Sequence, residues 1–242
     1  MVVLITGAYG AIGKAACIAY AKTASLLFIT GREQLKLDRL ALQLQQEFNL
    51  PVEAIVTDVN NAEQIRALFQ RLSKVSKRLD VLIHCAGILT QSPLLMTRID
   101  EIQTCIATNL TSSILFCQQA SKLMMRNKYG VITLVSSVVA RQGSAGQSIY
   151  GAAKAGIEGL VKSLAKELGA VGIRINALAP GFIDTNLVKH FSAEEKSQVA
   201  DKTCIGRIGQ VDDITPVLQF LSSDGAKYIT GEVIAVDGGL AL

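Results

Sequence analysis

Tyr150 and Lys154 are the two residues whose types and spacing most directly suggest chemistry, because they stand four positions apart. Residues i and i+4 share one face of a helix, so a helix here would place the ammonium group beside the phenol. An unperturbed tyrosine has a pKa of about 10, too high for easy proton exchange at neutral pH. A cation ~4 Å away is worth up to about 4 kcal/mol at an effective dielectric constant of about 20. We therefore expect Lys154 to lower the pKa of Tyr150 toward the range of effective acid–base catalysis.

A pair of serines, Ser136 and Ser137, follows the apolar run at 131–135. If this run is a strand of a doubly wound sheet, both serines lie at its carboxyl end, where such sheets place their ligand sites. A hydroxyl group there could hydrogen-bond the oxygen of a substrate carbonyl. On position alone, both serines are candidates.

The elements that must position these residues are short aliphatic strands alternating with helices. Seven runs are continuously apolar, as expected for strands covered on both faces: 2–5, 26–29, 52–56, 81–83, 131–135, 173–178 and 233–236. Between them, residues 33–48 and 61–75 repeat apolar side chains with the helical period. The alternation predicts an α/β fold, a doubly wound (Rossmann) sheet of about seven parallel strands with helices on both faces.

The composition fits such a sheet. Apolar residues make up 50% of the 242 residues, aromatic residues only 5%, and tryptophan is absent, so the core must be aliphatic. No linker, repeat or low-complexity tract interrupts the chain, and we predict one dinucleotide-binding and catalytic domain over 1–242. Within it, the polar segment 181–207 lacks a strand, and Ser192 with Glu195 resembles a capping box. We expect this segment to be a substrate lid with a short helix.

A glycine-rich turn, residues 6–13 (TGAYGAIG), follows the first strand. Glycines allow a tight turn and a close approach of the backbone to a pyrophosphate group. The helix that follows would add free N–H groups and a partial positive charge at its N-terminus. The first strand-to-helix turn of a doubly wound sheet is where dinucleotides bind.

The charge pattern excludes little. The net charge of +4 is too small to indicate nucleic-acid binding. Two groups of basic residues are either solvated helix faces or an attraction for an anionic cofactor or carrier: Lys122, Arg126 and Lys128, and Lys196, Lys202 and Arg207.

The cysteines and histidines indicate a reducing compartment and no metal site. The five cysteines form no C-x-x-C pair, and all but Cys204 lie in or beside apolar runs, so we expect small buried hydrophobes. His84 and His190 are the only histidines, and their separation argues against zinc. The chain has no run of eighteen apolar residues and no room for a signal peptide before the first strand. We expect a cytoplasmic protein, or one in an organellar matrix if an import sequence has been removed.

With these residues the chain resembles the short-chain dehydrogenase/reductase family. The first turn of that family has the pattern T-G-x-x-x-G-x-G at the extreme N-terminus, which residues 6–13 resemble. The family combines a Tyr-x-x-x-Lys pair with a helix asparagine and a serine thirteen residues before the tyrosine, a gap that favours Ser137 over Ser136. The resemblance implies that Tyr150 donates a proton to the substrate oxygen, and that Lys154 holds the nicotinamide ribose. It implies that Asn109 relays protons through a water molecule, which completes a catalytic set of Asn109, Ser137, Tyr150 and Lys154.

The resemblance also implies a nicotinamide cofactor. No carboxylate ends the second strand, where NAD-selective sites commonly hold the ribose 2′-hydroxyl group. Arg32 stands there and can pair with a 2′-phosphate, so we expect NADPH. Asp58 and Val59 match the pair that contacts adenine, and Thr185 with the backbone of Ile183 matches the carboxamide site. The expected cofactor-binding residues are Gly7, Tyr9, Gly10, Ile12, Gly13, Arg32, Asp58, Val59, Ala86, Gly87, Tyr150, Lys154, Ile183 and Thr185.

One motif departs from the family. After the fourth strand the family usually has N-N-A-G, and this chain has His84-Cys85-Ala86-Gly87. Ala86 and Gly87 keep the close backbone approach. We expect Cys85 to bring a modest structural cost and no loss of chemistry.

Within the family, the chain most resembles the 3-oxoacyl-[acyl-carrier-protein] reductases of fatty-acid synthesis. The resemblance is carried by 146–150 (GQSIY), 179–185 (APGFIDT), 206–209 (GRIG) and 228–239 (YITGEVIAVDGG). It implies NADPH-dependent reduction of a carrier-bound 3-oxoacyl thioester to the 3-hydroxyacyl thioester. That subgroup docks its acidic carrier with basic residues beside the cleft: Lys128 fills one such position, Arg126 lies near it, and Val171 stands at the second. The resemblance also implies a homotetramer, built on 100–126, 150–168 and the C-terminal segment 229–242.

Two alternatives remain open. A general carbonyl, quinone or hydroxysteroid reductase would use the same residues on another ketone. A non-catalytic NADP-binding subunit would usually lack Tyr150 or Lys154, and both are present.

Overall fold

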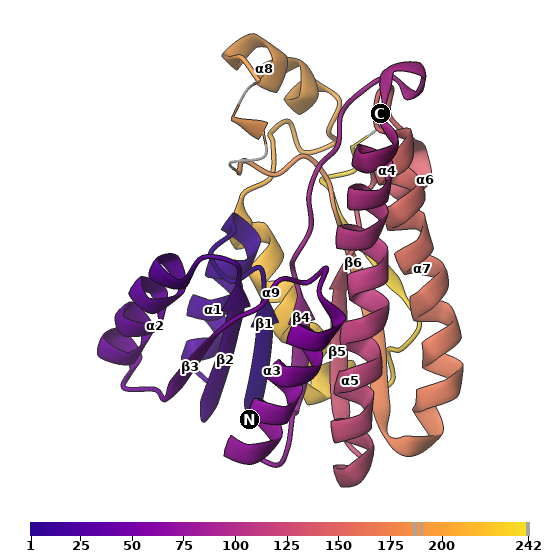
Figure 1. The fold of residues 1–242 in the computed structure, drawn as a ribbon. Helices are drawn as coiled ribbons and strands as arrows, with labels where there is room; N and C mark the ends of the chain where they lie inside the picture. The colour runs from indigo at the N-terminus through magenta and orange to yellow at the C-terminus, as the bar shows by residue number, and fades with distance from the viewer. Residues whose placement is uncertain (186–187, 190, 241–242) are drawn as a thin grey trace.

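The computed structural model describes residues 1–185, 188–189 and 191–240, and its centre is one sheet of seven parallel strands (Figure 1). The strands are β1 (Val2–Thr6), β2 (Leu26–Gly31), β3 (Val52–Val56), β4 (Val81–His84), β5 (Gly130–Val135), β6 (Ile173–Pro180) and β7 (Val233–Val236). Their order in the sheet is β3-β2-β1-β4-β5-β6-β7. The doubly wound α/β fold predicted from the sequence is confirmed.

The strand order reverses direction between β1 and β4. From β1 the chain adds β2 and β3 on one side, and from β4 it adds the remaining strands on the other. Helices that follow the two central strands therefore lie on opposite faces, and a crevice forms at the carboxyl edge between them. Thr6 and His84, which end β1 and β4, are paired neighbours at this point.

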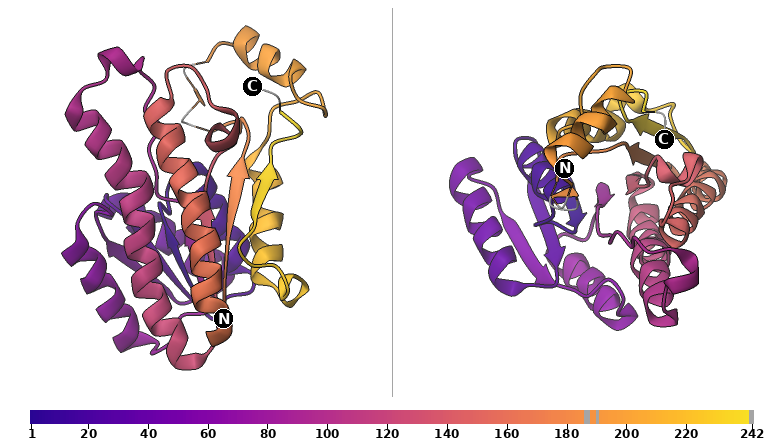
Figure 2. Two further views of the ribbon diagram at one scale, coloured as in Figure 1. Left: turned by 90° about the vertical axis from the view of Figure 1, so that its right-hand side faces the viewer. Right: turned by 90° about the horizontal axis from the view of Figure 1, so that it is seen from above.

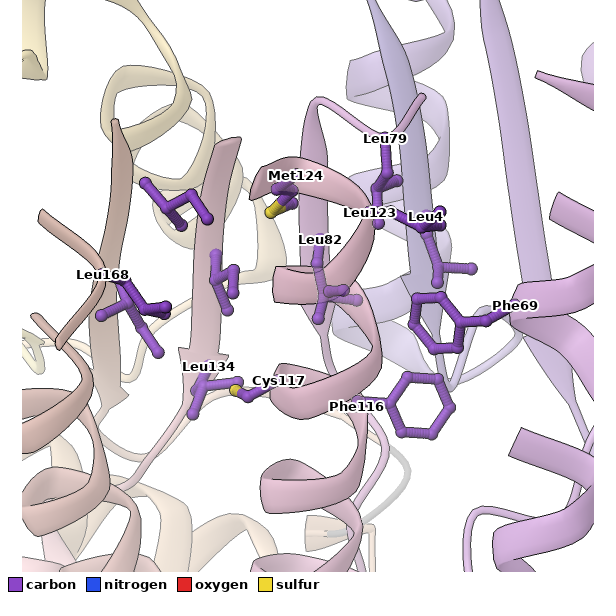
Figure 3. Close-up of a cluster of buried hydrophobic side chains, with 14 of the residues drawn as sticks. Leu4, Phe69, Leu79, Leu82, Phe116, Cys117, Leu123, Met124, Leu134 and Leu168 are labelled. Atoms are coloured by element: carbon purple, nitrogen blue, oxygen red, sulfur yellow. The ribbon is translucent and has the colours of Figure 1, made fainter. Parts of the chain in front are cut away.

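Helices cover both faces of the sheet (Figure 2). On one face lie α1 (Ala11–Ala21), α2 (Gln34–Phe48) and α9 (Val211–Ser222), and on the other lie α3 (Ala62–Val75), α5 (Ser112–Asn127) and α7 (Ser148–Leu168). Successive side chains of a strand enter opposite cores: Leu4 joins the core under α3, α5 and α7, and Val3 and Ile5 join the other. Figure 3 shows the first core, with Leu4 and Phe116. Because both faces are covered, most strand positions are apolar.

The expected strands and helices are all present, with ends that differ by one or two residues. β2 continues to Gly31 and β6 to Pro180, two residues beyond the apolar runs. These residues still pair with a neighbouring strand, Gly31 with Val56 and Pro180 with Val236. Backbone pairing does not depend on apolar side chains, so the apolar pattern does not predict these strand ends.

The structure adds elements that the apolar pattern does not predict. α4 (Ile99–Ile106) continues through a π-helical turn, η2 (Ala107–Thr111), into α5, and this turn carries Asn109. Such turns are rare and often lie at functional sites. The other additions are η1 (Leu94–Met96), α6 (Val139–Gln142), η3 (Gly169–Val171) and η5 (Asp224–Ala226).

The segment 181–207 carries α8 (Ala193–Asp201), which stands beyond the carboxyl edge of the sheet, at the top of Figure 1. Ser192 caps this helix: its hydroxyl accepts from the Glu195 N–H group at 3.2 Å, and the Glu195 carboxylate accepts from the Ser192 N–H group at 2.7 Å. The predicted capping box is confirmed. Residues 186, 187 and His190 of this segment lie outside the described residues, as do 241 and 242 of the expected C-terminal contact.

The cysteines are free thiols. Cys17, Cys105 and Cys117 are buried, Cys85 is partly buried and Cys204 is exposed, which confirms the predicted burial. Over the described part of the chain, no helix combines the length and apolar character needed to cross a membrane.

Candidate active site

The turn between β1 and α1 is shaped by two glycines. Gly7 has a φ of +62°, in the left-handed region that favours glycine. A Cβ atom on Gly13 would lie 2.2 Å from the Gly7 carbonyl oxygen, so α1 packs directly on the turn. Gly10 caps α1 in an extended conformation that any residue adopts. The resemblance of residues 6–13 to T-G-x-x-x-G-x-G is incomplete, because the second glycine of that pattern falls on Ala11 and the chain has Gly10 one position earlier.

This turn fits a dinucleotide. The first N–H groups of α1 have no acceptor within the helix and point toward the carboxyl edge of the sheet. The first turn of α1 contains no acidic residue, so the positive end of the helix dipole is available to a phosphate group. The Ile12 side chain packs on the core, which leaves its backbone facing the turn.

Tyr9 connects the turn to the end of β2. A Cβ atom on Gly31 would lie 2.4 Å from the Tyr9 ring, so the ring lies directly on that glycine. The Tyr9 hydroxyl accepts from the Arg32 N–H group at 3.0 Å. The ammonium group of Lys36 lies 5.4 Å from the centre of the Tyr9 ring. The Arg32 side chain is exposed at this corner.

Asp58 and Val59 lie after β3, on the same side of the crevice as Arg32. The Thr57 N–H group donates to the Gly31 carbonyl at 2.9 Å, which holds this loop against the end of β2. The Asp58 N–H group donates to the Gln64 side chain at 2.7 Å. Val59 is buried in the core, so it can offer only its backbone and a small part of its side chain to a ligand.

The strip Ala86-Gly87 continues from β4. The Ala86 N–H group donates to the Thr6 hydroxyl at 3.2 Å. A Cβ atom on Gly87 would lie 2.8 Å from Asn109 Oδ1 and 3.4 Å from Lys154 Nζ. Glycine is therefore required at position 87 for these two side chains to approach the strip.

Tyr150, Lys154 and Ser137 meet at the carboxyl edge. Tyr150 and Lys154 share one face of α7, and the Lys154 nitrogen lies 5.6 Å from the centre of the Tyr150 ring. The Lys154 ammonium is buried and donates to the Val135 carbonyl at 2.8 Å. The Ser137 hydroxyl accepts from the Val139 N–H group at 3.3 Å and lies close enough to the Tyr150 side chain to lower its pKa.

The structure separates the two serine candidates. The Ser136 hydroxyl donates toward the Lys154 carbonyl at 3.2 Å and the Glu158 carboxylate at 3.3 Å. Its side chain therefore points into the packing of α7 on the sheet and away from Tyr150. Only Ser137 of this pair has its hydroxyl at the phenol.

Asn109 is held at both ends of its amide group. Its Nδ2 atom donates to the Ile88 carbonyl at 2.9 Å and the Cys105 carbonyl at 3.0 Å, and its Oδ1 atom accepts from the Ile88 N–H group at 3.2 Å. The side chain is fully buried. Asn109 is thus fixed beside Gly87 and Lys154.

Burial controls the pKa values of the Tyr150–Lys154 pair. Burial raises the pKa of Tyr150, and the hydrogen bond with Ser137 opposes this in part. Burial lowers the pKa of Lys154 to about 8, with the thiols of Cys85 and Cys105 acting in the opposite direction. The expectation that Lys154 lowers the pKa of Tyr150 is therefore wrong for this arrangement. The ammonium group lies against the face of the ring and donates to Val135, so desolvation of the phenol is the larger effect.

Ile183 and Thr185 follow β6. Ile183 is buried and pairs with Gly209 in an isolated parallel bridge, and the Asp184 N–H group donates to the Gly209 carbonyl at 2.8 Å. Thr185 is half-buried and lines a cavity of about 520 Å³ between this segment, α1 and α9. The loop is therefore fixed to the rest of the protein at Ile183, and Thr185 faces the cavity.

Three buried polar residues at this edge were not assigned a role from the sequence. Cys105 lies one turn before Asn109 and accepts from it through its carbonyl. Glu158 is buried on α7 and pairs with Arg141 at 3.2 Å. His84 is buried between Thr6 and Ser112. The one sequence signal was at His84, where the chain departs from the N-N-A-G pattern.

Comparison with known proteins agrees with this geometry. Residues 7–241 match the protein family described as Enoyl-(Acyl carrier protein) reductase. The 3-oxoacyl-[acyl-carrier-protein] reductase FabG of Thermotoga maritima is 34% identical over 243 residues, which cover 100% of this chain and 98% of that protein. The 3-oxoacyl-[acyl-carrier-protein] reductase of Synechocystis sp. is 35% identical over 243 residues, covering 100% of this chain and 97% of that protein. This chain belongs to the short-chain dehydrogenase/reductase family.

Solved structures share the whole fold. A putative gluconate dehydrogenase from Agrobacterium tumefaciens superposes with a TM-score of 0.94 at 28% identity, covering 98% of this chain and 94% of that chain. A short-chain type dehydrogenase/reductase from Mycobacterium ulcerans gives 0.94 at 29% identity, covering 98% and 88%. As a short-chain dehydrogenase/reductase, this chain is an oxidoreductase that uses a nicotinamide cofactor.

The two serines give a matched pair of variants. Ser137→Ala should lower kcat by roughly 10²–10³-fold with nucleotide binding retained, because it removes a hydrogen bond beside the reacting oxygen. Ser136→Ala should change kcat by less than about threefold and destabilise the fold by about 1 kcal/mol, because its hydroxyl serves α7. Cofactor oxidation with a reducible ketone and urea unfolding measure the two effects. A larger loss of kcat in Ser136→Ala would contradict this assignment.

The buried Lys154 predicts a pH-dependent stability. Its folded pKa of about 8 lies below the ordinary 10.5, so between these values the unfolded chain binds more protons and wild-type stability rises with pH. Lys154→Met removes this titration. The stability advantage of the variant should be up to about 3 kcal/mol larger at pH 7 than above pH 10.5. Urea unfolding across this window measures the difference, and an advantage that grows with pH would disprove the argument.

Proposed function

We propose that this chain reduces a 3-oxoacyl thioester, carried on acyl carrier protein, to the 3-hydroxyacyl thioester with NADPH, in fatty-acid synthesis. The observation that carries the proposal is the meeting of Ser137, Tyr150 and Lys154 beside the phosphate turn. A phenol, a hydroxyl and an ammonium group together suit protonation of a carbonyl oxygen. The names of relatives at 34–35% identity point to this substrate class.

The proposed mechanism adds one hydride and one proton across the C=O bond. The nicotinamide cofactor supplies the hydride to the carbonyl carbon. Tyr150 donates its phenolic proton to the carbonyl oxygen, and the raised pKa of Tyr150 keeps that proton in place at neutral pH. The Ser137 hydroxyl orients the same oxygen. The product is the secondary alcohol.

Lys154 and Asn109 are proposed to replace the proton that Tyr150 gives up. With a pKa of about 8, Lys154 is largely protonated at neutral pH and still able to exchange its proton. Lys154 would hold the ribose of a bound nicotinamide cofactor, and its ammonium group would return a proton to the Tyr150 phenolate. Asn109, fixed by Ile88 and Cys105, is placed to hold a water molecule that connects Lys154 to solvent.

The end of β2 supports NADPH as the cofactor. Arg32 is exposed beside Lys36, and the nearest carboxylate, Glu33, is paired with Lys36 at 2.7 Å. A 2′-phosphate there would meet the exposed Arg32 guanidinium, and Glu33 is already neutralised by Lys36. Arg32 can bind it through a bidentate, charge-assisted contact.

Reversal of the charge at Arg32 tests the cofactor. Arg32→Glu should lower kcat/KM for NADPH by roughly 100-fold or more, because a charged hydrogen bond is lost and a repulsion is added. The value for NADH should change by less than about fivefold. Arg39→Glu, also exposed on α2, is the matched control and should leave the NADPH preference intact. Equal effects of the two variants, or a wild type that prefers NADH, would reject NADPH.

A panel of substrates tests the reaction. We expect NADPH oxidation with acetoacetyl thioester on a carrier protein or on coenzyme A, and a loss of roughly 10²–10⁴-fold in Tyr150→Phe, which removes the proton donor. Quinones, steroid ketones and a crotonyl thioester complete the panel. Activity on quinones or steroids alone would make the chain a general ketone reductase, and activity on the crotonyl C=C bond alone would make it an enoyl reductase. Nucleotide binding without turnover would indicate a non-catalytic subunit.

Docking of an acyl carrier protein near Arg126 and Lys128 stays a prediction. The positions of the two residues in the fold limit how a docked carrier could reach a cleft. Both residues stand at the end of α5, just before β5 begins, so they lie at the amino edge of the sheet. The 16 residues of α5 span about 24 Å from there to the carboxyl edge. Within one chain, Arg126 and Lys128 therefore lie at the edge of the sheet opposite the cleft. A second copy of the chain is needed to bring Arg126 and Lys128 close to a cleft.

The proposed homotetramer would provide such a copy. The helices expected to form its contacts expose apolar side chains: Ile99 on α4 is 73% exposed, and Ile114 and Met125 on α5 are 44% and 48% exposed. Exposed apolar residues along one helix pair favour a protein contact. At the C-terminus, Leu240 is already buried within its own chain.

A further inference from the structure

His84 occupies the junction between the cofactor turn and the catalytic asparagine turn. It ends β4, is 2% exposed, and stacks near Phe116 with ring centres 4.9 Å apart. Its Nδ1 atom lies 2.9 Å from the Thr6 hydroxyl, and its Nε2 atom lies 3.1 Å from the Ser112 hydroxyl. Thr6 directly precedes Gly7 of the phosphate turn. Ser112 directly follows the π-helical turn that carries Asn109.

The hydrogen bonds around His84 fit together in one chain of donors and acceptors. The Ala86 N–H group donates to the Thr6 hydroxyl oxygen, so the Thr6 proton is free to go to His84 Nδ1. The Ser112 hydroxyl donates to the Thr108 carbonyl at 2.6 Å, so its oxygen accepts from His84 Nε2–H. The chain therefore runs from Ala86 through Thr6, His84 and Ser112 to Thr108. This chain corresponds to the neutral imidazole with its proton on Nε2.

We propose that His84, as the neutral Nε2–H tautomer, is a positioning residue that fixes the phosphate turn and the Asn109 turn relative to each other. Through Thr6 it acts on Gly7 and on the Ala86-Gly87 strip. Through Ser112 it acts on the turn that holds Asn109. The catalytic part of this inference rests on the function proposed above, because Asn109 has its role there.

The surroundings of His84 support the neutral form. The imidazole has no contact with solvent that could hydrate a positive charge, and burial lowers its pKa to about 3. Lys154 of α7 is the charged group that acts on the ring, and its positive charge disfavours a second cation. A proton on Nδ1 would also face the Thr6 oxygen, which already accepts from Ala86, and would displace the Thr6 proton from its acceptor. Neutrality and hydrogen-bond direction therefore agree.

Two substitutions test the two hydrogen bonds of His84 separately: the bond to Thr6 (the Thr6 arm) and the bond to Ser112 (the Ser112 arm). An asparagine amide reaches the position of Nδ1, so His84→Asn keeps the Thr6 arm and loses the Ser112 arm. A glutamine amide reaches the position of Nε2, so His84→Gln keeps the Ser112 arm and loses the Thr6 arm. His84→Phe loses both. Thr133→Val on neighbouring β5 is the control, because the Thr133 hydroxyl is buried without a hydrogen-bond partner among the described residues.

The expected result is a split between catalysis and cofactor binding. His84→Asn should lower kcat at least tenfold and change the Kd for NADPH less than threefold. His84→Gln should raise the Kd for NADPH at least fivefold, with the smaller effect on kcat. His84→Phe should show both losses, and Thr133→Val neither. Equal losses of kcat and affinity in the Asn and Gln variants, or lower melting temperatures without either loss, would make His84 a packing residue and overturn the proposal.

A measurement without substrate keeps this test separate from the proposed function. His84 and His190 are the only histidines, so ¹⁵N spectra of the imidazoles can be assigned with one His190→Gln variant. We expect the His84 ring to show a protonated Nε2 and to stay neutral down to about pH 4. The Asn109 side-chain amide signals should shift in His84→Asn and stay in place in His84→Gln. A proton on Nδ1, or titration of His84 near pH 6.5, would overturn the proposal whatever substrate the enzyme uses.

Discussion

The burial of one ammonium group, that of Lys154, is the constraint on which this site depends. Removing a charge from water is costly unless polar groups replace its hydration. The Val135 carbonyl accepts a hydrogen bond from it, and the Tyr150 ring covers it. Room for it exists because residue 87 is a glycine, whose missing Cβ would lie 3.4 Å from the ammonium nitrogen. The result is a cation with a lowered pKa beside a phenol with a raised one, a pair suited to passing a proton.

The sheet brings the other partners to this cation. All seven strands are parallel, so their carboxyl ends share one edge, and the order reverses between β1 and β4. Thr6 and His84 become neighbours there, and the phosphate turn meets the strip that carries Gly87. β5 adds Val135 and Ser137 at the same edge. Residues far apart in the sequence thus converge without any long loop having to carry them.

Helix α7 carries both catalytic residues and a structural carboxylate along one face. Tyr150, Lys154 and Glu158 follow at intervals of four, and the first two face the crevice. Glu158 is buried deeper, where its carboxylate is satisfied by Arg141 and by the Ser136 hydroxyl. Arg141 also donates to the Val233 carbonyl of β7 at 3.1 Å. This second polar cluster fixes α7 against α6 and β7, and so holds Tyr150 and Lys154 in position.

The sequence by itself determined the strands, the helices and the sheet class, because strands covered on two faces appear as short runs that are mostly apolar. It also determined the capping box at Ser192, since a cap depends on residues three positions apart. Tertiary structure decided the rest. It turned the Ser136 hydroxyl toward Glu158, and it reversed the expected pKa shift of Tyr150 because desolvation depends on all neighbours at once. It also placed Asn109 on a π-helical turn, bridged β1 and α5 with His84, and put Arg126 at the far edge. Those relations join residues that are distant in sequence, and spacing along the chain carries no information about them.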